Sequence, residues 1–391
     1  MNWNDKTAAN VKAIKPSGIR KFFDIAAQVK GVLSLSIGEP DFAAPDKVLA
    51  AMKASLDAKE TSYTGNSGMM ELREAISHHF EQRYGVHYDP KDEILVTVGV
   101  SEGLAMALLA ITEPGDEVII PDPAYVAYPA SVELAGGTPI FVPTYPEHDF
   151  KLTVEALEKV ITPKTKAIVI GYPNNPTGTV MSAEELMPIA KFAEEHDLIV
   201  LSDEIYCELM YGDAKFTSFA KLPGMRERTV IFNGFSKAYA MTGMRLGYVC
   251  APREGLAPIL KLHQYAIMCA NTTAQVGGIT ALKECDDDVE AMRQEYDRRR
   301  KVIYKGLCDM GLPVFEPKGA FYIFPDIRCT GMTSAEFCEK LVQEEKVAVV
   351  PGTAFGDQGE GFVRISYAAS MDTIQEALKR MARFVAKYRK D

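Results

Sequence analysis

The chain has 391 residues, of which 47% are hydrophobic and 25% are charged, a composition that is ordinary for a globular protein. A chain of this length predicts two domains, or one large domain with a smaller appendage. Its 53 acidic residues outnumber its 43 basic ones, which gives a net charge of −10, and no basic stretch stands out. This balance argues against nucleic acid or an anionic membrane as a partner.

The cysteines and histidines show none of the usual disulfide or metal-binding spacings. Seven cysteines occur without a CxxC or CxxH pair, and six histidines occur without an HExxH motif. We therefore expect no disulfide framework, no metal site and a reducing, cytoplasmic location. The first residues lack the apolar core of a signal peptide, and the apolar run 104–111 is too short to span a bilayer. No GxxxxGK[ST] loop is present, and no GxGxxG motif follows a predicted strand.

Short apolar, β-branched runs alternate with longer helical patterns through the middle of the chain. This alternation is typical of a mainly parallel sheet with crossover helices. One predicted helix spans 103–111, and another, at 183–196, opens with a capping box formed by Ser182 and Glu185. The sequence thus predicts an α/β fold with a mainly parallel seven-stranded sheet and helices on both faces. Strands are expected at residues 94–98, 117–121, 140–143, 167–171, 199–202, 230–232 and 246–250.

After about residue 285 the pattern changes. A large domain is expected to span residues 46–285, and a smaller α+β domain is expected to form from both chain ends, residues 1–45 and 286–391. The expected elements of the second part are a long charged helix at 289–310, short strands around 319–324 and 348–351, and a terminal helix from Met371 onward.

Lys237 is the most informative residue of the sequence, because it follows a predicted strand at the edge where an α/β sheet presents its ligands. Alone, it fits a solvated surface lysine as well as a Schiff-base nucleophile. Ser236 and Arg245 lie close by in sequence and supply a hydroxyl and a guanidinium suited to an anion. Together the three residues suggest an aldehyde cofactor that carries a phosphate, a description that fits pyridoxal 5′-phosphate (PLP).

Two further strand ends carry polar groups suited to the same cofactor. Asp203 follows a buried strand, where a carboxylate needs a partner such as a protonated pyridine nitrogen. A helix N-cap is an equally good interpretation of this residue. Asn175 lies in a loop bounded by Pro and Gly, from which it could donate to the phenolate oxygen of PLP, and Tyr206 could share that oxygen. A plain Asn-Pro turn is the alternative for Asn175.

The strand ends near residues 98 and 121 complete the predicted site. The first leads through a Gly-containing turn into a helix, so the N–H groups of Val100 and Ser101 are expected to point at an anion such as phosphate. Ser101 could equally serve only as a helix cap. The second strand end leads to Tyr125, which could lay its ring on the cofactor or lie in the core.

A series of ordered motifs resembles one known family, the PLP-dependent aminotransferases of fold type I, class I. The resemblance is to the branch that includes aspartate, alanine and aromatic aminotransferases, and it covers nearly the whole chain. The motifs are Gly38-Glu-Pro-Asp-Phe42, Tyr63-Thr-Gly-Asn-Ser-Gly68, NNPTG, SDEIY, GFSKAYAMTGMRLGY and Val363-Arg-Ile-Ser-Tyr367.

The resemblance implies roles that the residues alone do not reveal. Lys237 is expected to form the Schiff base and to carry the proton between substrate and cofactor. Tyr63 is expected to reach the phosphate of the neighbouring subunit, which makes a homodimer the expected active unit. Arg364 is expected to clamp the substrate α-carboxylate as a bidentate fork, with Gly38 and Asn175 beside it. Without the family, Arg364 is an ordinary strand arginine.

The implied reaction is a ping-pong exchange of an amino group between an L-amino acid and a 2-oxo acid, with 2-oxoglutarate as the expected acceptor. Members that use aspartate often carry a lysine where this chain has Ser101, so the donor stays open among aspartate, aromatic and alanine-like amino acids. The residues expected to line the pocket for the substrate side chain are Ile14, Ser17, Gly18, Ile37 and Tyr322.

Two alternatives to an aminotransferase are retained at this point. A carbon–sulfur β-lyase of the same fold is one, although such lyases tend to carry histidines where this chain has Asn174 and Tyr206. The other is a non-catalytic regulator that keeps the fold, a class of protein that has no chemical need for Lys237, Asp203 and Arg364 together.

Overall fold

The structure is a computed structural model that describes residues 1–14, 18 and 29–390. Its largest sheet has seven strands in the order β2-β8-β7-β6-β5-β3-β4. β8 runs antiparallel to both of its neighbours, and the other pairings are parallel. The predicted α/β fold with a mainly parallel seven-stranded sheet is therefore confirmed. The strands are β2 (Ile94–Thr97), β3 (Glu117–Asp122), β4 (Thr138–Pro143), β5 (Thr165–Ile170), β6 (Ile199–Asp203), β7 (Thr229–Gly234) and β8 (Gly247–Cys250).

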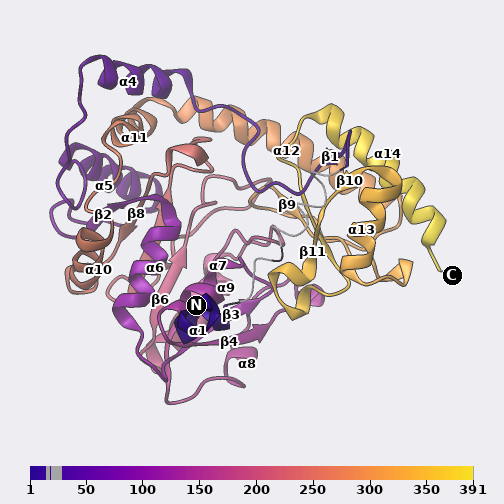
Figure 1. The fold of residues 1–391 in the computed structure, drawn as a ribbon, viewed down its shortest axis with the longest axis horizontal. Coiled ribbons are helices and arrows are strands. Elements are labelled where there is room, and N and C mark those ends of the chain that lie inside the picture. Colours follow the sequence, from indigo (N-terminus) through magenta and orange to yellow (C-terminus); the bar gives the residue numbers. More distant parts are fainter. Residues whose placement is uncertain (15–17, 19–28, 391) are drawn as a thin grey trace.

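Helices cover both faces of this sheet (Figure 1). They are α4 (Asp46–Asp57), α5 (Met70–Tyr84), α6 (Gly99–Ile111), α7 (Ala127–Leu134), α8 (Val154–Leu157), α9 (Ala183–Glu195), α10 (Arg253–Ala266) and α11 (Thr272–Glu284). Because neighbouring side chains of a strand point to opposite faces, Val118 and Ile120 of β3 pack with α6, α7 and α10, whereas Ile119 packs with α8 and α9. α4, α5 and α11 cover β2 and β8 on the side opposite to α6. The capping box predicted at Ser182 and Glu185 is present at the start of α9.

Helix α6 begins four residues earlier than the predicted span 103–111. Its first residue, Gly99, has a left-handed φ of 73° and directly follows the N-cap Val98. Two glycines within five residues, Gly99 and Gly103, favour a loop interpretation in the sequence. In the fold, however, a Cβ on Gly103 would lie 2.6 Å from Val249, so this glycine allows the helix to pack closely on β8. The early start places Val100 and Ser101 in the first turn of the helix.

The C-terminal part of the chain builds a second cluster of elements beside the large sheet. β11 (Val350–Pro351), β12 (Val363–Ser366) and β9 (Tyr322–Ile323) form an antiparallel sheet, and β1 (Leu33–Ser34) pairs in parallel with β10 (Val347–Ala348). They pack with α12 (Asp286–Asp309), α13 (Ser334–Glu345) and α14 (Met371–Tyr388) around one buried apolar core. In Figure 1, α12 runs from the neighbourhood of α11 to that of α14.

The pairing of β1 with β10 joins a segment near the beginning of the chain to one near its end. This supports the proposed division into a large domain at 46–285 and a small domain from 1–45 and 286–391, which stays a proposal. Residues 15–17 and 19–28 of that small domain, and residue 391, lie outside the described residues. The first residues form two short helices, α1 (Trp3–Lys6) and α2 (Ala9–Ala13), and α2 contacts α7.

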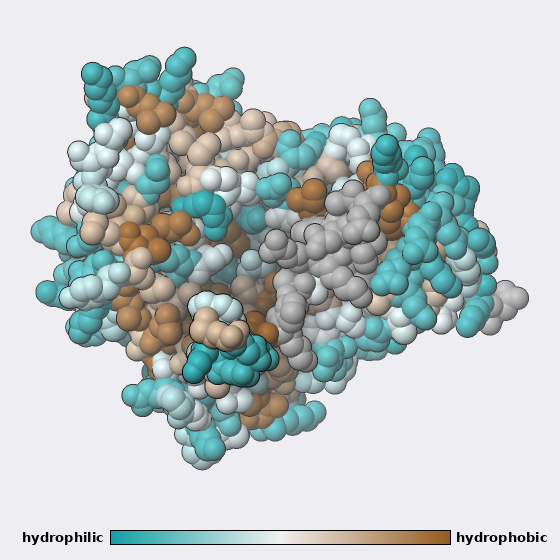
Figure 2. Space-filling view, in the orientation of Figure 1, coloured by the Kyte–Doolittle hydropathy of each residue, from teal (hydrophilic) through white to brown (hydrophobic). Residues whose placement is uncertain are grey.

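The surface in Figure 2 is mostly hydrophilic along its outer edges, and hydrophobic residues are more frequent nearer the centre of the view. Over the part of the chain that the structure describes, no helix combines the length and the apolar character needed to cross a membrane. The buried apolar side chains are instead used in packing the helices against the sheets.

Candidate active site

A cavity of about 460 Å³ lies at the carboxyl ends of the large sheet, and residues of β9 and β12 complete its wall. Parallel α/β sheets present their ligands at this edge. The residues predicted to bind the cofactor and the substrate α-carboxylate come from distant parts of the sequence, and the structure brings all of them but Tyr63 into this one cavity. Those that line it are Gly38, Val100, Ser101, Tyr125, Asn175, Asp203, Tyr206, Ser236, Lys237, Arg245 and Arg364.

Lys237 lies on the loop that joins β7 to β8. The loop is closed at its base, because Gly234 and Gly247 pair in adjacent strands. The Lys237 Nζ donates a hydrogen bond of 2.7 Å to the Gly38 carbonyl oxygen. Burial, followed by the nearby charge of Arg364, lowers the pKa of the lysine to about 8. Near that pH half of the amine is neutral, which is the form that attacks an aldehyde.

The start of α6 forms one wall of the cavity and directs its first N–H groups there. A Cβ on Gly99 would lie 2.7 Å from a guanidinium nitrogen of Arg245, so only glycine permits both this approach and the left-handed backbone. Arg245 therefore lies next to the positive end of α6, and the hydroxyls of Ser101 and Ser236 line the same cavity. Helix N-terminus, guanidinium and hydroxyls together suit a phosphate.

Asp203 is the last residue of β6, and its side chain is buried. Its Oδ2 accepts a hydrogen bond of 2.8 Å from the Tyr128 hydroxyl, and its Oδ1 accepts one of 3.2 Å from the Ile205 N–H. Burial raises the pKa of Asp203, and the hydrogen bond from Tyr128 opposes that shift. Both of these donors are neutral, so a cation beside the carboxylate would favour its ionised form. A turn follows Asp203, and the helix N-cap interpretation is wrong.

Arg364 projects from β12 and is buried. Its Nη1 donates to Asn175 Oδ1 over 3.0 Å, and its Nη2 donates to the Ser36 carbonyl oxygen over 2.6 Å. The guanidinium lies 4.5 Å from the centre of the Tyr322 ring and 4.8 Å from that of Phe355. Its Nε is buried without a hydrogen-bond partner among the described residues. The fork is thus fixed in orientation between two rings and retains donor capacity for an anion.

Tyr206 and Tyr125 hold their rings at the cavity by contacts with other aromatic residues. The Tyr206 and Tyr322 hydroxyls lie 2.8 Å apart, and burial raises the pKa of Tyr206 well above its ordinary value. The Tyr125 ring meets that of Tyr128 edge to face, with the ring centres 5.6 Å apart. Burial also raises the pKa of Tyr125, so both phenols stay protonated and can donate.

Tyr63 is 81% exposed and does not lie among the described residues that line the cavity. Of the residues expected around the substrate side chain, Tyr322 lines the cavity, whereas Ile14, Gly18 and Ile37 do not appear among its described lining residues. Ser17 lies outside the described residues.

Sequence reasoning missed three polar residues of the cavity: Tyr128, Glu39 and Thr242. Tyr128 lies three residues after Tyr125, a spacing that places both on one face of a helical turn, and this could have indicated it. The Thr242 hydroxyl donates to Glu39 Oε2 over 3.1 Å, a contact between distant segments that has no local signal. The charge of Glu39 raises the pKa of Lys237 and partly offsets the effects of burial and Arg364.

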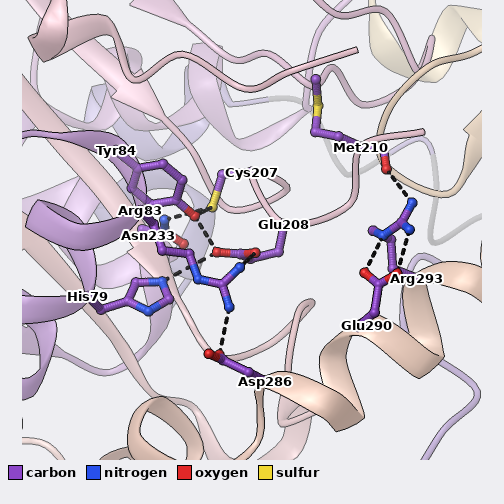
Figure 3. A network of polar contacts seen from close by, with 10 residues as sticks. All are labelled: His79, Arg83, Tyr84, Cys207, Glu208, Met210, Asn233, Asp286, Glu290 and Arg293. Atoms are coloured by element: carbon purple, nitrogen blue, oxygen red, sulfur yellow. Dashed lines mark hydrogen bonds and ion pairs between the residues drawn. The ribbon is translucent and has the colours of Figure 1, made fainter. Parts of the chain in front are cut away.

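A polar network involves residues that directly follow Tyr206 in the chain and do not line the cavity (Figure 3). The Glu208 carboxylate contacts the Tyr84 hydroxyl and lies 3.0 Å from Arg83 Nη1 and 3.3 Å from His79 Nε2. Arg83 in turn pairs over 2.6 Å with Asp286 at the start of α12. We call these residues the Glu208 cluster. It ties the segment that carries Tyr206 to α5 and α12.

The neighbouring Cys207 links the Glu208 cluster to β7. Its Sγ lies 3.1 Å from the Tyr84 hydroxyl and accepts a hydrogen bond of 3.2 Å from the Asn233 side chain. Asn233 precedes the loop that carries Lys237, and the Asn233 Oδ1 accepts from the Gly234 N–H over 2.7 Å. The segment that carries Tyr206 is therefore hydrogen-bonded to the end of β7, which leads into the loop that carries Lys237.

A sequence profile described as aminotransferase class I and II matches residues 30–381 of the chain. The chain belongs to this family. Among curated aminotransferases, it is 50% identical to the aspartate aminotransferase of Pyrococcus abyssi over 94% of its own length and 95% of that protein. It is 47% identical to aromatic-amino-acid aminotransferase 2 of Thermococcus litoralis, over 95% and 96% of the two chains. Its fold superposes on the crystal structure of the aromatic aminotransferase of Pyrococcus horikoshii with a TM-score of 0.90, at 48% identity over 94% and 99% of the chains.

The aminotransferase is accordingly a PLP-dependent enzyme that transfers an amino group between an amino acid and a 2-oxo acid. The residues present fit this cofactor. Gly99 permits Arg245 to approach the N-terminus of α6, which suits the phosphate, and the buried Asp203 carboxylate with neutral donors suits a cationic ring nitrogen. Lys237, with its lowered pKa, suits the aldehyde.

Proposed function

We propose that Lys237, Asp203 and Arg364 form the reaction centre of a ping-pong transamination. The observation that supports this proposal is the convergence of the three side chains in one cavity, where the pKa of each is shifted by burial toward its neutral form. Charged groups in such surroundings cost free energy unless a ligand brings complementary groups. A cofactor with a cationic ring and a substrate with a carboxylate supply these.

The remaining cavity residues are assigned to the cofactor. Asp203 would pair with the ring nitrogen, which holds it protonated, and Asn175 and Tyr206 would donate to the phenolic oxygen. Tyr125 would pack on the ring. When bound, PLP supplies an electron sink for negative charge at the substrate Cα. The phosphate would be held by Val100, Ser101, Ser236 and Arg245.

The chain's own groups hold the substrate and move the proton. Lys237 would bind the cofactor aldehyde in its neutral form and would carry the proton that leaves the substrate Cα, because its nitrogen lies in the cavity beside Gly38. Arg364 would bind the substrate α-carboxylate. Asn175 and Ser36 orient its guanidinium in advance, so little side-chain entropy is lost when substrate binds.

The proposed donors are aspartate, aromatic and alanine-like amino acids, with 2-oxoglutarate as the acceptor. The similar proteins of P. abyssi and T. litoralis are named for aspartate and for aromatic amino acids, respectively. In this chain Ser101, rather than a cation, lies in the first turn of α6.

We further propose a cytoplasmic homodimer in which Tyr63 reaches the partner's cofactor phosphate. The loop that carries Tyr63 is held by a bond of 2.8 Å from the Thr272 hydroxyl to the Ser62 carbonyl. Close to it, Asn66 donates to the Met268 carbonyl, and Tyr265 is 87% exposed. The exposed rings of Tyr63 and Tyr265 support a contact with a protein partner here. The seven free cysteines are compatible with a reducing compartment.

The deciding experiment supplies the purified protein with PLP, a panel of amino acids and 2-oxoglutarate. We expect glutamate to appear in step with loss of 2-oxoglutarate, and parallel double-reciprocal plots, as a ping-pong course requires. Release of ammonia and pyruvate from a cysteine conjugate, without need of 2-oxoglutarate, would instead identify a β-lyase. Light scattering of the same sample measures the subunit number, and a monomeric active enzyme would exclude the proposed dimer.

A further inference from the structure

A histidine that no proposed catalytic step uses is completely buried against α6, the helix that begins at the candidate phosphate site. His263 lies in α10 with 0% of its side chain exposed. Its Nδ1 is 2.7 Å from Oε1 of Glu102, and only 8% of the Glu102 side chain is exposed. A buried carboxylate needs hydrogen-bond partners, and His263 supplies one from a different helix.

The second oxygen of Glu102 reaches back over the turn that begins α6. Oε2 accepts a hydrogen bond of 2.7 Å from the N–H of Val98, the N-cap residue of that helix. This bond closes the turn that carries Gly99, Val100 and Ser101, in the way that a capping box closes a helix start. Glu102 is thus the hydrogen-bond acceptor of the Val98 N–H. The first N–H groups of α6, including those of Val100 and Ser101, stay available to the cavity.

The other nitrogen of His263 has no hydrogen-bond partner among the described residues. Among the described residues, the side-chain hydrogen bond of His263 is thus the one with Glu102. A hydrogen bond from a closely packed ring fixes the position of the carboxylate, and the carboxylate fixes the Val98 turn. The two contacts form a chain from α10 to the start of α6.

We propose that His263 and Glu102 are positioning residues for the phosphate of PLP. They hold the β2–α6 turn so that its N–H groups and Arg245 meet around the phosphate. The proposal rests on the phosphate role given above to Val100 and Ser101. It adds two residues that do not touch the cofactor and are expected to act on its phosphate alone, not on its ring or aldehyde.

The test compares the affinity of the PLP-free enzyme for PLP with its affinity for pyridoxal, which keeps the ring and aldehyde and lacks the phosphate. His263→Phe fills the same space and removes the hydrogen bond. We expect its dissociation constant for PLP to rise by roughly threefold to tenfold, the range of one net hydrogen bond, while that for pyridoxal is unchanged. His263→Gln, whose amide can donate to Glu102, is expected to restore most of the PLP affinity.

The chain offers a matched control in a second buried pair of the same kind. His79 Nε2, in α5, lies 3.3 Å from Glu208 (Figure 3). α5 and α6 pack on opposite sides of the large sheet. His79→Phe is expected to lower the unfolding temperature and to leave the ratio of the PLP and pyridoxal constants as in the wild type. Circular dichroism of each variant verifies the fold.

Results of two kinds would contradict the proposal, some against the positioning role of His263 and one against the phosphate site itself. Equal weakening of PLP and pyridoxal in His263→Phe, or no weakening, would overturn the positioning role. Failure of His263→Gln to regain PLP affinity would also overturn it. If the wild type itself binds pyridoxal as tightly as PLP, the phosphate site of the proposed function is wrong, and the assignment of His263 and Glu102 fails with it.

Discussion

Charged residues on the two sides of the segment 203–208 have pKa shifts of opposite kinds. On the cavity side, burial shifts the pKa of Asp203, Lys237 and Arg364 toward the neutral form. On the other side lies the Glu208 cluster. Burial alone would raise the pKa of Glu208, but hydrogen bonds from His79 and Tyr84 and the charge of Arg83 lower it below its ordinary value.

This difference in pKa shifts distinguishes residues that bind a ligand from residues that stabilise the fold. The Glu208 carboxylate has its cationic and neutral donors within the protein, so its charge is already stabilised. The charged forms of the three cavity residues are stabilised less well by the protein. Complementary groups on the cofactor and the substrate would stabilise them further. We therefore expect substitutions on the cavity side to reduce activity, and substitutions in the Glu208 cluster to reduce stability.

The largest effect on activity is expected for Lys237→Ala, because the group that binds the aldehyde and carries the proton is removed. Steady-state transamination should fall by roughly 10⁴-fold or more, and the visible absorbance of the bound cofactor should be lost. Lys261→Ala, at an exposed position in α10, is the control and should keep full activity. Near-normal turnover in Lys237→Ala would remove this lysine from the reaction centre.

Asp203→Asn is expected to leave the fold intact and to lower the rate of a single half-reaction by roughly 100-fold or more, because an amide does not hold the ring nitrogen protonated. Rapid mixing of the PLP-loaded variant with an amino acid measures this rate. The control is Asp213→Asn, an exposed aspartate paired with Lys318. A wild-type rate with PLP bound would show that Asp203 has a structural role only.

Arg364→Lys should reduce kcat/KM by roughly 30- to 150-fold for every donor, since a point ammonium does not reproduce a bidentate fork; this corresponds to a loss on the order of 2–3 kcal/mol. Aspartate, phenylalanine and alanine are the donors to compare. Ser101→Lys provides the contrast and should improve aspartate relative to the other two. Selective loss of one donor in Arg364→Lys would mean that this arginine reads the substrate side chain.

The lowered pKa of Lys237 predicts how the PLP-free enzyme captures its cofactor. Lysine attacks in its neutral form, so the rate constant should rise about tenfold per pH unit below pH 8 and level off above it. Absorbance after rapid mixing measures this profile. Because the Arg364 charge contributes to the low pKa, Arg364→Met should move the midpoint upward. A midpoint near that of an exposed lysine in the wild type would contradict the burial argument.

The smallest effect on activity is expected for Glu208→Gln, for which kcat/KM should change by less than about tenfold. The free energy of unfolding should fall by about 1–3 kcal/mol, because hydrogen bonds to a charged acceptor are lost. Urea unfolding measures this change. Glu81→Gln is the control: Glu81 also faces a histidine, His87, but both side chains are more than half exposed, so little stability should be lost. A large loss of activity without loss of stability would break the proposed separation of the two sides.

The strands of the large sheet could be predicted to within about two residues because their apolar, β-branched runs are bounded by Pro, Gly and charged residues. The start of α6 could not, because Gly99 and Gly103 indicate a loop in the sequence. The fold uses these glycines for a left-handed turn and for close packing on β8. The contacts of these glycines are with Arg245 and with Val249 of β8, far along the chain. A local sequence pattern therefore does not predict them.

The candidate site was predictable as far as it follows strand ends. Asp203 comes directly after a predicted strand, and Asn175 and Lys237 come four and five residues after theirs. Parallel strands bring such residues together. Tyr128 lies inside a helix, and its contact with Asp203 joins residues 75 positions apart. The Glu208 cluster draws on α5 and α12, so it is a product of helix packing that a single sequence does not reveal.

The closed loop between Gly234 and Gly247 returns the chain at once to the large sheet, all of whose strands are complete at Cys250. Ser236, Lys237 and Arg245 therefore leave the ribosome well before β12 is made. On the proposed assignment, the nascent chain first completes the edge that binds PLP and receives Arg364 only as translation nears its end. On the proposed assignment, the cofactor-binding residues of one chain therefore all precede the residue that recognises the substrate carboxylate in the order of synthesis.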